Sequence, residues 1–307
     1  MASDPVHVVG ASGRSGAALC RALAAAGQGF VPVVREATRW GAVGLPEPPV
    51  LADLEDAAAL HAALGDARAV VSCAHARHTG AILQAAPASR FVLLGSTRKF
   101  TAWPDAHARG VLAGEADFLA AGRPGVMLHP TMIYGAEGED NVQRLAALLR
   151  HLPAVPLPRG GAALVQPIHQ DDVTRCLLAA LGREWSGPEV LVIAGPVAVS
   201  YADFVRAVGV SAGLPPPRIL PLPMPLLRAG AALARLLPGL PRVHPDELRR
   251  LLEDKAFDIG PMRRALDVVP VGLAAGLAQT FAAQDGAAQN GAAQNGPAQN
   301  GPAQNGP

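Results

Sequence analysis

The stretch Val6-His7-Val8-Val9-Gly10-Ala11-Ser12-Gly13-Arg14-Ser15-Gly16 combines a short apolar strand, a glycine-rich turn and the beginning of a helix. Its glycines follow the spacing G-x-x-G-x-x-G. We expect Gly10 to permit a tight turn, Gly13 to let the backbone approach a pyrophosphate, and Gly16 to let the helix pack closely on the strand. Because the first amides of a helix favour anions, this context predicts a dinucleotide site. The predicted contacts from this loop are Gly10, Ser12, Gly13, Arg14, Ser15 and Gly16.

The composition is that of a globular chain with a sizeable core. Half of the 307 residues are apolar, 17% are charged, and the net charge is +1. This balance gives no electrostatic reason to expect nucleic-acid binding. The amino end shows no basic segment followed by an apolar run, and no apolar stretch reaches about 18 residues. We therefore expect a soluble, cytoplasmic protein.

The three cysteines, Cys20, Cys73 and Cys176, lie far apart in the sequence. They show no metal-ligand spacing and fall in apolar segments. We expect them to be reduced and buried, and we expect no metal site.

Short apolar segments alternate with helical segments over residues 1–135. The alternation predicts an α/β fold with a doubly wound parallel sheet, a Rossmann dinucleotide-binding core. Pro32 suggests an irregular or edge-like start to the second strand. The expected strands are Val6–Val9, Phe30–Val34, Val50–Leu54, Ala69–Cys73, Arg90–Gly95 and Gly125–His129. The expected helices are Ala17–Ala26, Glu55–Leu64, Gly80–Ala86 and Asp105–Ala121.

The rhythm changes after Pro130, where helices become more frequent. Residues 136–280 predict a small, mostly helical substrate lobe over the carboxyl edge of the sheet, with core elements returning at about 164–194. The expected helices are Asn141–His151, Asp172–Leu181, Ser200–Val208, Leu226–Leu237 and Asp246–Leu252. The expected strands are Leu164–Ile168 and Val190–Ala194, and Pro153–Gly161 is expected to be a loop.

Two segments of the second half have unusual compositions. Leu226–Leu237 is very apolar with two arginines, which admits a membrane-surface or partner-docking helix. An ordinary lobe helix with snorkelling arginines is the favoured alternative, so membrane association is not the leading expectation. Residues 281–307 consist largely of a Gly-Ala/Pro-Ala-Gln-Asn repeat without charge or apolar periodicity, and we expect them to be disordered.

Several motifs together resemble the short-chain dehydrogenase/reductase superfamily, in its atypical, extended-like form. They are the glycine motif, Asp53-Leu54, Gly95-Ser96-Thr97, the segment His129–Gly135 and the segment Pro167–Val173. The resemblance spans about residues 6–275. It is nearest to the branch of NmrA-like proteins, relatives of complex I accessory subunits and sugar-nucleotide epimerases.

The resemblance places Asp53 and Leu54 beside the adenine of a bound cofactor. An acidic residue at the end of the second strand would bind the ribose hydroxyls of NAD, but this position carries Arg35. Because arginine suits a 2′-phosphate, and Arg14 offers a second cation, NADP(H) is expected over NAD(H). The alternative is that both arginines are solvated loop charges. Outside the glycine loop, the predicted cofactor contacts are Arg35, Asp53, Leu54, Ala74, His75 and Pro130.

The resemblance also implies a Tyr-x-x-x-Lys pair, which lowers the tyrosine pKa for proton exchange with the substrate. This chain has no such pair, because Gly138 and Val205 stand four residues after its only tyrosines, Tyr134 and Tyr201. Aligning Glu115 with the glutamate that usually follows the pair puts histidine and valine at the two positions. The substitute catalytic candidates are Ser96, Thr97, His107 and Tyr134.

Each substitute has a plainer alternative. Ser96 and Thr97 stand where the family has its substrate-orienting hydroxyl, but they also suit a strand-end turn. For His107, an exposed histidine at a helix start is favoured over a proton donor. Packing is favoured for Tyr134, and a solvated loop position for Lys99. His169 and Asp172 are expected to orient a loop and cap a helix, and His75 and His78 to lie near the nicotinamide.

Two classes of function remain open. One is an NADP(H)-dependent oxidoreductase or epimerase-like enzyme acting on a small carbonyl or nucleotide-sugar-like molecule. The other is a non-catalytic dinucleotide-sensing or assembly protein that keeps the fold. The enzyme is slightly favoured by the intact motifs and the full-size lobe, and either a monomer or a homodimer fits the sequence.

Overall fold

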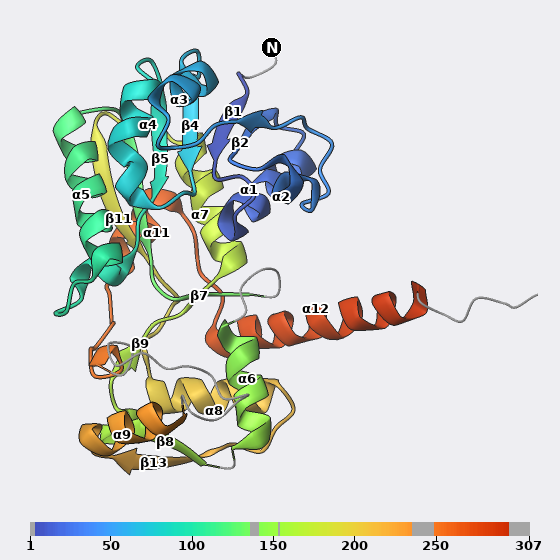
Figure 1. Ribbon diagram of the computed structural model, residues 1–307, viewed down its shortest axis with the longest axis vertical. Coiled ribbons are helices and arrows are strands. Elements are labelled where there is room, and N and C mark those ends of the chain that lie inside the picture. The colour runs from blue at the N-terminus through green and yellow to red at the C-terminus, as the bar shows by residue number, and fades with distance from the viewer. Residues whose placement is uncertain (1–3, 136–140, 153, 235–248, 295–307) are drawn as a thin grey trace, which may run out of the picture.

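A seven-stranded parallel sheet forms the centre of the molecule, with the strand order β11-β6-β5-β4-β1-β2-β3 (Figure 1). The computed structural model describes residues 4–135, 141–152, 154–234 and 249–294. The strands are β1 (Val6–Val9), β2 (Phe30–Val34), β3 (Val50–Leu51), β4 (Ala69–Ser72), β5 (Arg90–Leu94), β6 (Gly125–Pro130) and β11 (Pro188–Ile193). The expected doubly wound α/β class is confirmed.

The central strands are apolar throughout because both faces of the sheet are covered. Every residue of β4 and of β6 is buried. Pro32 of β2 pairs with Val8 of β1, whereas β3 pairs only with Val33 and Val34. The proline therefore precedes the start of β3, which explains how it fits in an inner strand.

Helices cover the two faces of this sheet (Figure 1). One face packs against α1 (Arg14–Ala25), α7 (Gln170–Gly182) and α11 (Gly260–Leu266). The other packs against α3 (Ala57–Leu64), α4 (Thr79–Ala85) and α5 (Ala106–Ala121). The elements α7 and β11 come from the second half of the chain and pack in the core with the elements of the first half. The short helix α2 (Ala37–Gly41) follows β2.

The second half also builds a separate lobe beyond the carboxyl ends of the strands (Figure 1). Its core contains Val142, Val155, Phe204 and Leu277. Its helices are α6 (Asn141–His151), α8 (Tyr201–Ser211) and α9 (Met224–Ala234). Its two-stranded sheets pair β8 (Ala154–Pro158) with β13 (Arg218–Leu222), β9 (Leu164–Val165) with β12 (Val199–Ser200), and β7 (Ile133–Tyr134) with β10 (Ile168–His169).

Several lobe elements differ from the sequence prediction. The expected loop 153–161 contains β8 followed by the 3₁₀ turn η3 (Arg159–Gly161). The prolines of this segment suggested a loop, but proline is tolerated in the edge strands of a two-stranded sheet. The expected strand 164–168 is divided between β9 and β10. Parts of the expected helices 226–237 and 246–252 lie outside the described residues.

The last described helix, α12 (Leu273–Gln294), projects from the body of the molecule (Figure 1). It crosses the expected lobe boundary at residue 280, so residues 281–294 of the segment expected to be disordered are helical here. Leu277 anchors the helix in the lobe core, and alanine and glutamine favour its continuation. Residues 295–307 lie outside the described residues. Within the described ranges, no helix combines the length and apolarity needed to cross a bilayer.

Candidate functional site

The glycine loop joins β1 to α1 in a closely packed turn. Gly10 has a φ of +74°, and the Gly13 amide donates to the Gly10 carbonyl at 2.9 Å. A Cβ at Gly16 would lie 2.2 Å from the Gly10 carbonyl oxygen, so no larger residue fits there. Helix α1 begins at Arg14 without a side-chain cap, which leaves its first amides directed toward the turn. This backbone cradle fits a pyrophosphate.

A cavity of about 320 Å³, the glycine-loop cavity, opens at the carboxyl ends of β1 to β4. It lies where ligands bind in doubly wound α/β folds. Of the predicted cofactor contacts, it brings together Gly10, Ser12, Gly13, Arg35, Asp53, Leu54 and Ala74. Arg14, Ser15, Gly16, His75 and Pro130 are not among its described lining residues. Gly16 acts through the shape of the turn.

Arg35 and Arg39 form the charged rim of the glycine-loop cavity. The Glu36 carboxylate lies 3.1 Å from Arg35 Nη2 and 3.2 Å from Arg39 Nε. The two arginine side chains are 65% exposed, so both can turn toward a ligand. Arg39 was not predicted from the sequence. Its position four residues after Arg35 could have indicated that it lines the same cavity. Glu36, their shared partner, was not predicted either.

Arg14 lines a second cavity, of about 610 Å³, between α1, α7 and α12. The predicted pairing of Arg14 with Arg35 around one phosphate is therefore not supported by the lining of the glycine-loop cavity. Ser15 is also turned toward α7, because its hydroxyl donates to Gln170 Oε1 at 3.1 Å. Ser15 thus connects α1 to α7 in this structure.

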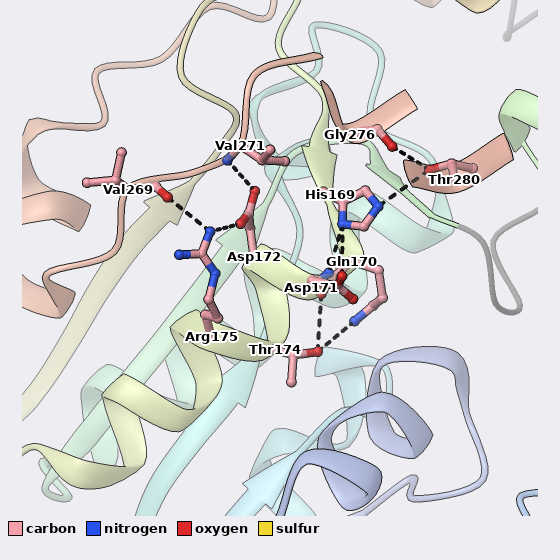
Figure 2. Close-up of polar contacts among 10 residues, drawn as sticks. All are labelled: His169, Gln170, Asp171, Asp172, Thr174, Arg175, Val269, Val271, Gly276 and Thr280. Carbon is pink, nitrogen blue, oxygen red and sulfur yellow. Dashed lines mark hydrogen bonds and ion pairs between the residues drawn. The ribbon is translucent and has the colours of Figure 1, made fainter. Parts of the chain in front are cut away.

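Figure 2 shows how the beginning of α7 is tied to α12 and to the segment before it. His169 caps α7 by accepting the Asp171 amide at 3.3 Å, and Thr280 lies 3.4 Å from its other ring nitrogen. Asp172 accepts the Val271 amide at 2.8 Å and pairs with Arg175. The expected capping role is thus confirmed for His169, whereas Asp172 lies inside α7 and joins it to the segment before α12.

Ser96 and Thr97 follow β5 and are held by backbone contacts. The Ser96 amide donates to His129 Nδ1 at 3.0 Å, and the Ser96 hydroxyl accepts the Arg98 amide at 3.2 Å. The Thr97 hydroxyl donates to the Pro130 carbonyl at 3.1 Å. The strand-end turn is thus present, and the Pro130 carbonyl stabilises it by accepting the Thr97 hydroxyl.

Lys99, Glu115 and His129 form a buried group, the β5–β6 network, behind Ser96. The Lys99 ammonium pairs with Glu115, and His129 Nε2 lies 2.6 Å from the same carboxylate, off the direction of a good hydrogen bond. Because His129 Nδ1 accepts the Ser96 amide, the ring proton is on Nε2. Burial and then the nearby Lys99 charge lower the pKa of His129 to about 4. Lys99 is only 10% exposed, so the expectation of a solvated loop lysine is wrong.

His107 lies in the first turn of α5 and contacts His75, which follows β4. His75 Nε2 and His107 Nδ1 are 3.0 Å apart, and both rings are half-buried. The favoured alternative of a plain exposed histidine is therefore incorrect. Val111, at the expected lysine position, is buried in α5.

Tyr134 is fully buried in the lobe core. Its ring packs edge-on against His169, and its hydroxyl reaches Gly276 of α12, where a Cβ would lie 2.2 Å from it. Burial raises the pKa of Tyr134, which disfavours the tyrosinate. The packing role is the one observed, and the hydroxyl makes no hydrogen bond within the described chain.

A third cavity, the lobe cavity, has a volume of about 210 Å³ and includes Thr131, Tyr201, Arg250 and Lys255 in its lining. Burial lowers the pKa of Lys255. Glu253 joins this wall to the segment after Ser96, because its carboxylate accepts the Thr101 hydroxyl at 2.6 Å and the Ala102 amide at 2.7 Å. Sequence reasoning missed these residues, which carry no motif.

The described residues form neither a metal-binding cluster nor a disulfide. No group of three or more His, Cys, Asp or Glu side chains in the described ranges could hold a metal ion. The three cysteines are unpaired; Cys20 and Cys176 are buried and Cys73 is half-buried beside the glycine-loop cavity.

No protein-family model matches this chain, and no curated protein is similar in sequence. Solved structures do match over nearly the whole chain. A short-chain dehydrogenase/reductase superfamily protein from Agrobacterium tumefaciens with bound NAD has 14% identity and a TM-score of 0.69, covering 94% of this chain and 99% of its own. The architecture is that of the short-chain dehydrogenases/reductases.

Two sugar-nucleotide enzymes show the same fold. A nucleoside-diphosphate-sugar epimerase from Pseudomonas aeruginosa has 20% identity and a TM-score of 0.69, covering 93% of this chain and 99% of its own. UDP-glucuronic acid 4-epimerase from Bacillus cereus, in complex with UDP-glucuronic acid and NAD, has 17% identity and a TM-score of 0.69, covering 92% and 99%. The short-chain dehydrogenase/reductase fold thus includes both the core and the lobe.

Proposed function

We propose that this protein is an NADP(H)-binding oxidoreductase or epimerase-like enzyme that acts on a small carbonyl or nucleotide-sugar-like substrate. The observation that carries the proposal is the glycine-loop cavity, in which the glycine cradle, Asp53-Leu54 and a charged rim meet. The likeness to NAD-bound and sugar-nucleotide enzymes supports the same class of ligand.

Different parts of the cavity would hold different parts of the cofactor. The pyrophosphate would lie on the Gly13 amide and the first turn of α1, and the adenosine against Asp53 and Leu54. Arg35 and Arg39 would grip a 2′-phosphate with bidentate hydrogen bonds. Glu36 is the competing feature, because a carboxylate at this place can accept the ribose hydroxyls of NAD. NADP is therefore the specific part of the proposal that needs its own test.

The substrate would lie between the core and the lobe. Ser96 and Thr97 are at the carboxyl end of β5, and the lobe cavity adds Lys255 and Arg250 as cations for a phosphate or carboxylate. A bound nicotinamide supplies a hydride donor or acceptor at this end of the site. The protein residues would bind and orient the substrate and exclude water from it.

Calorimetry with NADP⁺ and NAD⁺ tests the cofactor proposal. We expect NADP⁺ to bind and to bind more tightly than NAD⁺. A tighter complex with NAD⁺ would remove the phosphate specificity alone, and absence of heat with both would overturn the dinucleotide site. Turnover is then tested by following NADPH absorbance with a panel of carbonyl compounds and by product analysis with UDP-sugars.

A non-catalytic dinucleotide sensor is the second candidate. It is favoured by the replacement of the Tyr-Lys pair with His107 and buried Val111, and by the burial of Tyr134 away from the cavity. Cofactor binding without conversion of any member of the substrate panel would favour this sensor over the enzyme.

A further inference from the structure

His75 and His107 join the carboxyl end of β4 to the beginning of α5. The turn after β4 is close to the glycine loop, because a Cβ at Gly10 would lie 3.0 Å from the Ala74 amide nitrogen. The glycine-loop cavity lies over β1 to β4, so the far half of a bound dinucleotide would extend past this turn. The histidine pair therefore lies where the nicotinamide end would be.

The hydrogen bonds around His75 fix its tautomer. Its Nδ1 accepts the Arg77 amide at 3.1 Å, so this nitrogen carries no proton in the neutral ring. The proton of neutral His75 is then on Nε2, which lies 3.0 Å from His107 Nδ1. His75 must be the donor and His107 Nδ1 the acceptor.

The same logic continues to the second ring. With Nδ1 accepting, neutral His107 carries its proton on Nε2. No hydrogen bond from that nitrogen occurs within the described part of the chain. Helix α5 leaves room for this arrangement at Gly110, where a Cβ would lie 2.8 Å from His75 Cε1.

We propose that His75 is a positioning residue that holds His107 as the Nε2-protonated tautomer, so that His107 presents a neutral hydrogen-bond donor to the nicotinamide end of the ligand site. The donor's role toward the ligand rests on the function proposed above. The tautomer itself does not, because it follows from the backbone amide and the contact between the rings.

Burial, together with the neighbouring arginines, keeps the pair neutral. His107 is faced by Arg98, Asp105 and Arg250, and His75 by Arg77 and His78. Burial is the main cause that lowers the pKa of both histidines, and the arginines lower it further. A proton added to either bonded nitrogen would also break one of the two hydrogen bonds. At neutral pH the pair thus serves as a donor without a net charge.

Nitrogen NMR of the full chain with ¹⁵N-labelled histidine tests the tautomer directly. At pH 7 we expect His107 Nδ1 to show the shift of an unprotonated nitrogen and Nε2 that of a protonated one. His107→Gln assigns the signals. A wild-type His107 that is protonated on Nδ1, or charged at pH 7, would overturn the proposal.

Three variants separate positioning from mere packing. In His75→Ala we expect His107 to populate both tautomers and its titration midpoint to rise toward the ordinary value of about 6.5. His75→Gln retains an amide donor and should restore the Nε2 tautomer. His78→Ala is the matched control, since its ring accepts from the Arg77 side chain at 2.9 Å and not from the pair. An unchanged His107 in His75→Ala would show that His75 does not position it.

Added NADP⁺ tests the role toward the ligand. We expect the His107 Nε2 signal to shift in proportion to the bound fraction measured by calorimetry. Bound NADP⁺ with an unmoved His107 signal would overturn the donor role while leaving the cofactor site intact. If no NADP⁺ binds, the proposed function fails, whereas the tautomer measurements still decide the role of His75.

Discussion

The two ends of the candidate site are shaped in different ways. At the glycine-loop cavity the main-chain turn makes the shape, and a Cβ at Gly16 would overlap the Gly10 carbonyl. At the carboxyl ends of β5 and β6, buried side chains make it: Ser96 is held by His129, which lies against Glu115 and Lys99. The shape of the glycine-loop end is determined by a local pattern of glycines. The shape of the other end depends on residues far apart in the chain.

The largest effect is expected from Gly16→Ala, which attacks the main-chain end. Its methyl group would lie 2.2 Å from a backbone oxygen that cannot move without opening the turn. Overpacking of this kind costs about 3 kcal/mol of folding stability. Because the strain is relieved by opening the turn, and the closed turn is the proposed pyrophosphate site, we expect NADP⁺ affinity to fall on the order of 100-fold. Calorimetry measures the affinity and denaturant unfolding the stability.

Gly182→Ala is the matched control for that substitution. Gly182 ends α7, and a Cβ there meets no atom within 4 Å. We expect unchanged binding. Equal losses in both variants would show that the close approach at Gly16 does not govern the site.

The side-chain end is tested by the acid dependence of stability. Because the pKa of His129 is lowered to about 4 in the folded protein, the unfolded chain binds a proton more readily between pH 6.5 and 4. Stability therefore falls as the pH falls through this window, by about 3 kcal/mol from this group. The lowered pKa values of His75 and His107 add to the same trend.

His129→Gln isolates that contribution, since its amide oxygen can still accept the Ser96 amide. We expect the free energy of unfolding, measured in urea from pH 7 to 4, to depend less on pH in this variant. The difference in slope should correspond to close to one proton. The exposed His61→Gln on α3 is the control and should keep the slope. A wild-type slope in His129→Gln would mean that the buried ring is not the source.

The contrast between the two ends also explains what sequence could predict. The core strand segments and the Gly10–Gly16 turn follow from local patterns, whereas Asp53-Leu54 was placed at the cofactor by the family resemblance. The structure brings most of the residues predicted from the turn and from Asp53-Leu54 to one cavity. The Lys99–Glu115–His129 contacts and the His75–His107 pair span 14 to 32 positions without a spacing rule. The strand β8 was missed because its prolines suggested a loop.

A smaller effect is expected at the rim of the glycine-loop cavity, where the proposed function places Arg35 and Arg39 at the 2′-phosphate of NADP. Arg35→Gln and Arg39→Gln should each weaken NADP⁺ about tenfold and leave NAD⁺ nearly unchanged, because each removes a charge beside the 2′ position. Calorimetry with both cofactors gives the ratio.

Arg14→Gln is the informative comparison, because Arg14 lines the cavity between α1, α7 and α12. We expect its NADP⁺/NAD⁺ ratio to match that of the wild type. A tenfold change in the NADP⁺/NAD⁺ affinity ratio would show that Arg14 contacts the 2′-phosphate, and it would contradict the separation of the two cavities.

The smallest effect is expected from Ser15→Ala. Ser15 belongs to the glycine loop, but its side chain contacts α7. Its hydroxyl is engaged by Gln170 Oε1 at 3.1 Å, so the variant loses one partly buried hydrogen bond, worth about 1 kcal/mol. Denaturant unfolding should detect this loss while NADP⁺ affinity stays within a factor of about two. If the affinity instead falls tenfold without loss of stability, the hydroxyl turns from α7 to the pyrophosphate on binding. In that case a side chain, as well as the main chain, shapes the glycine-loop end, and the contrast between the two ends is one of degree.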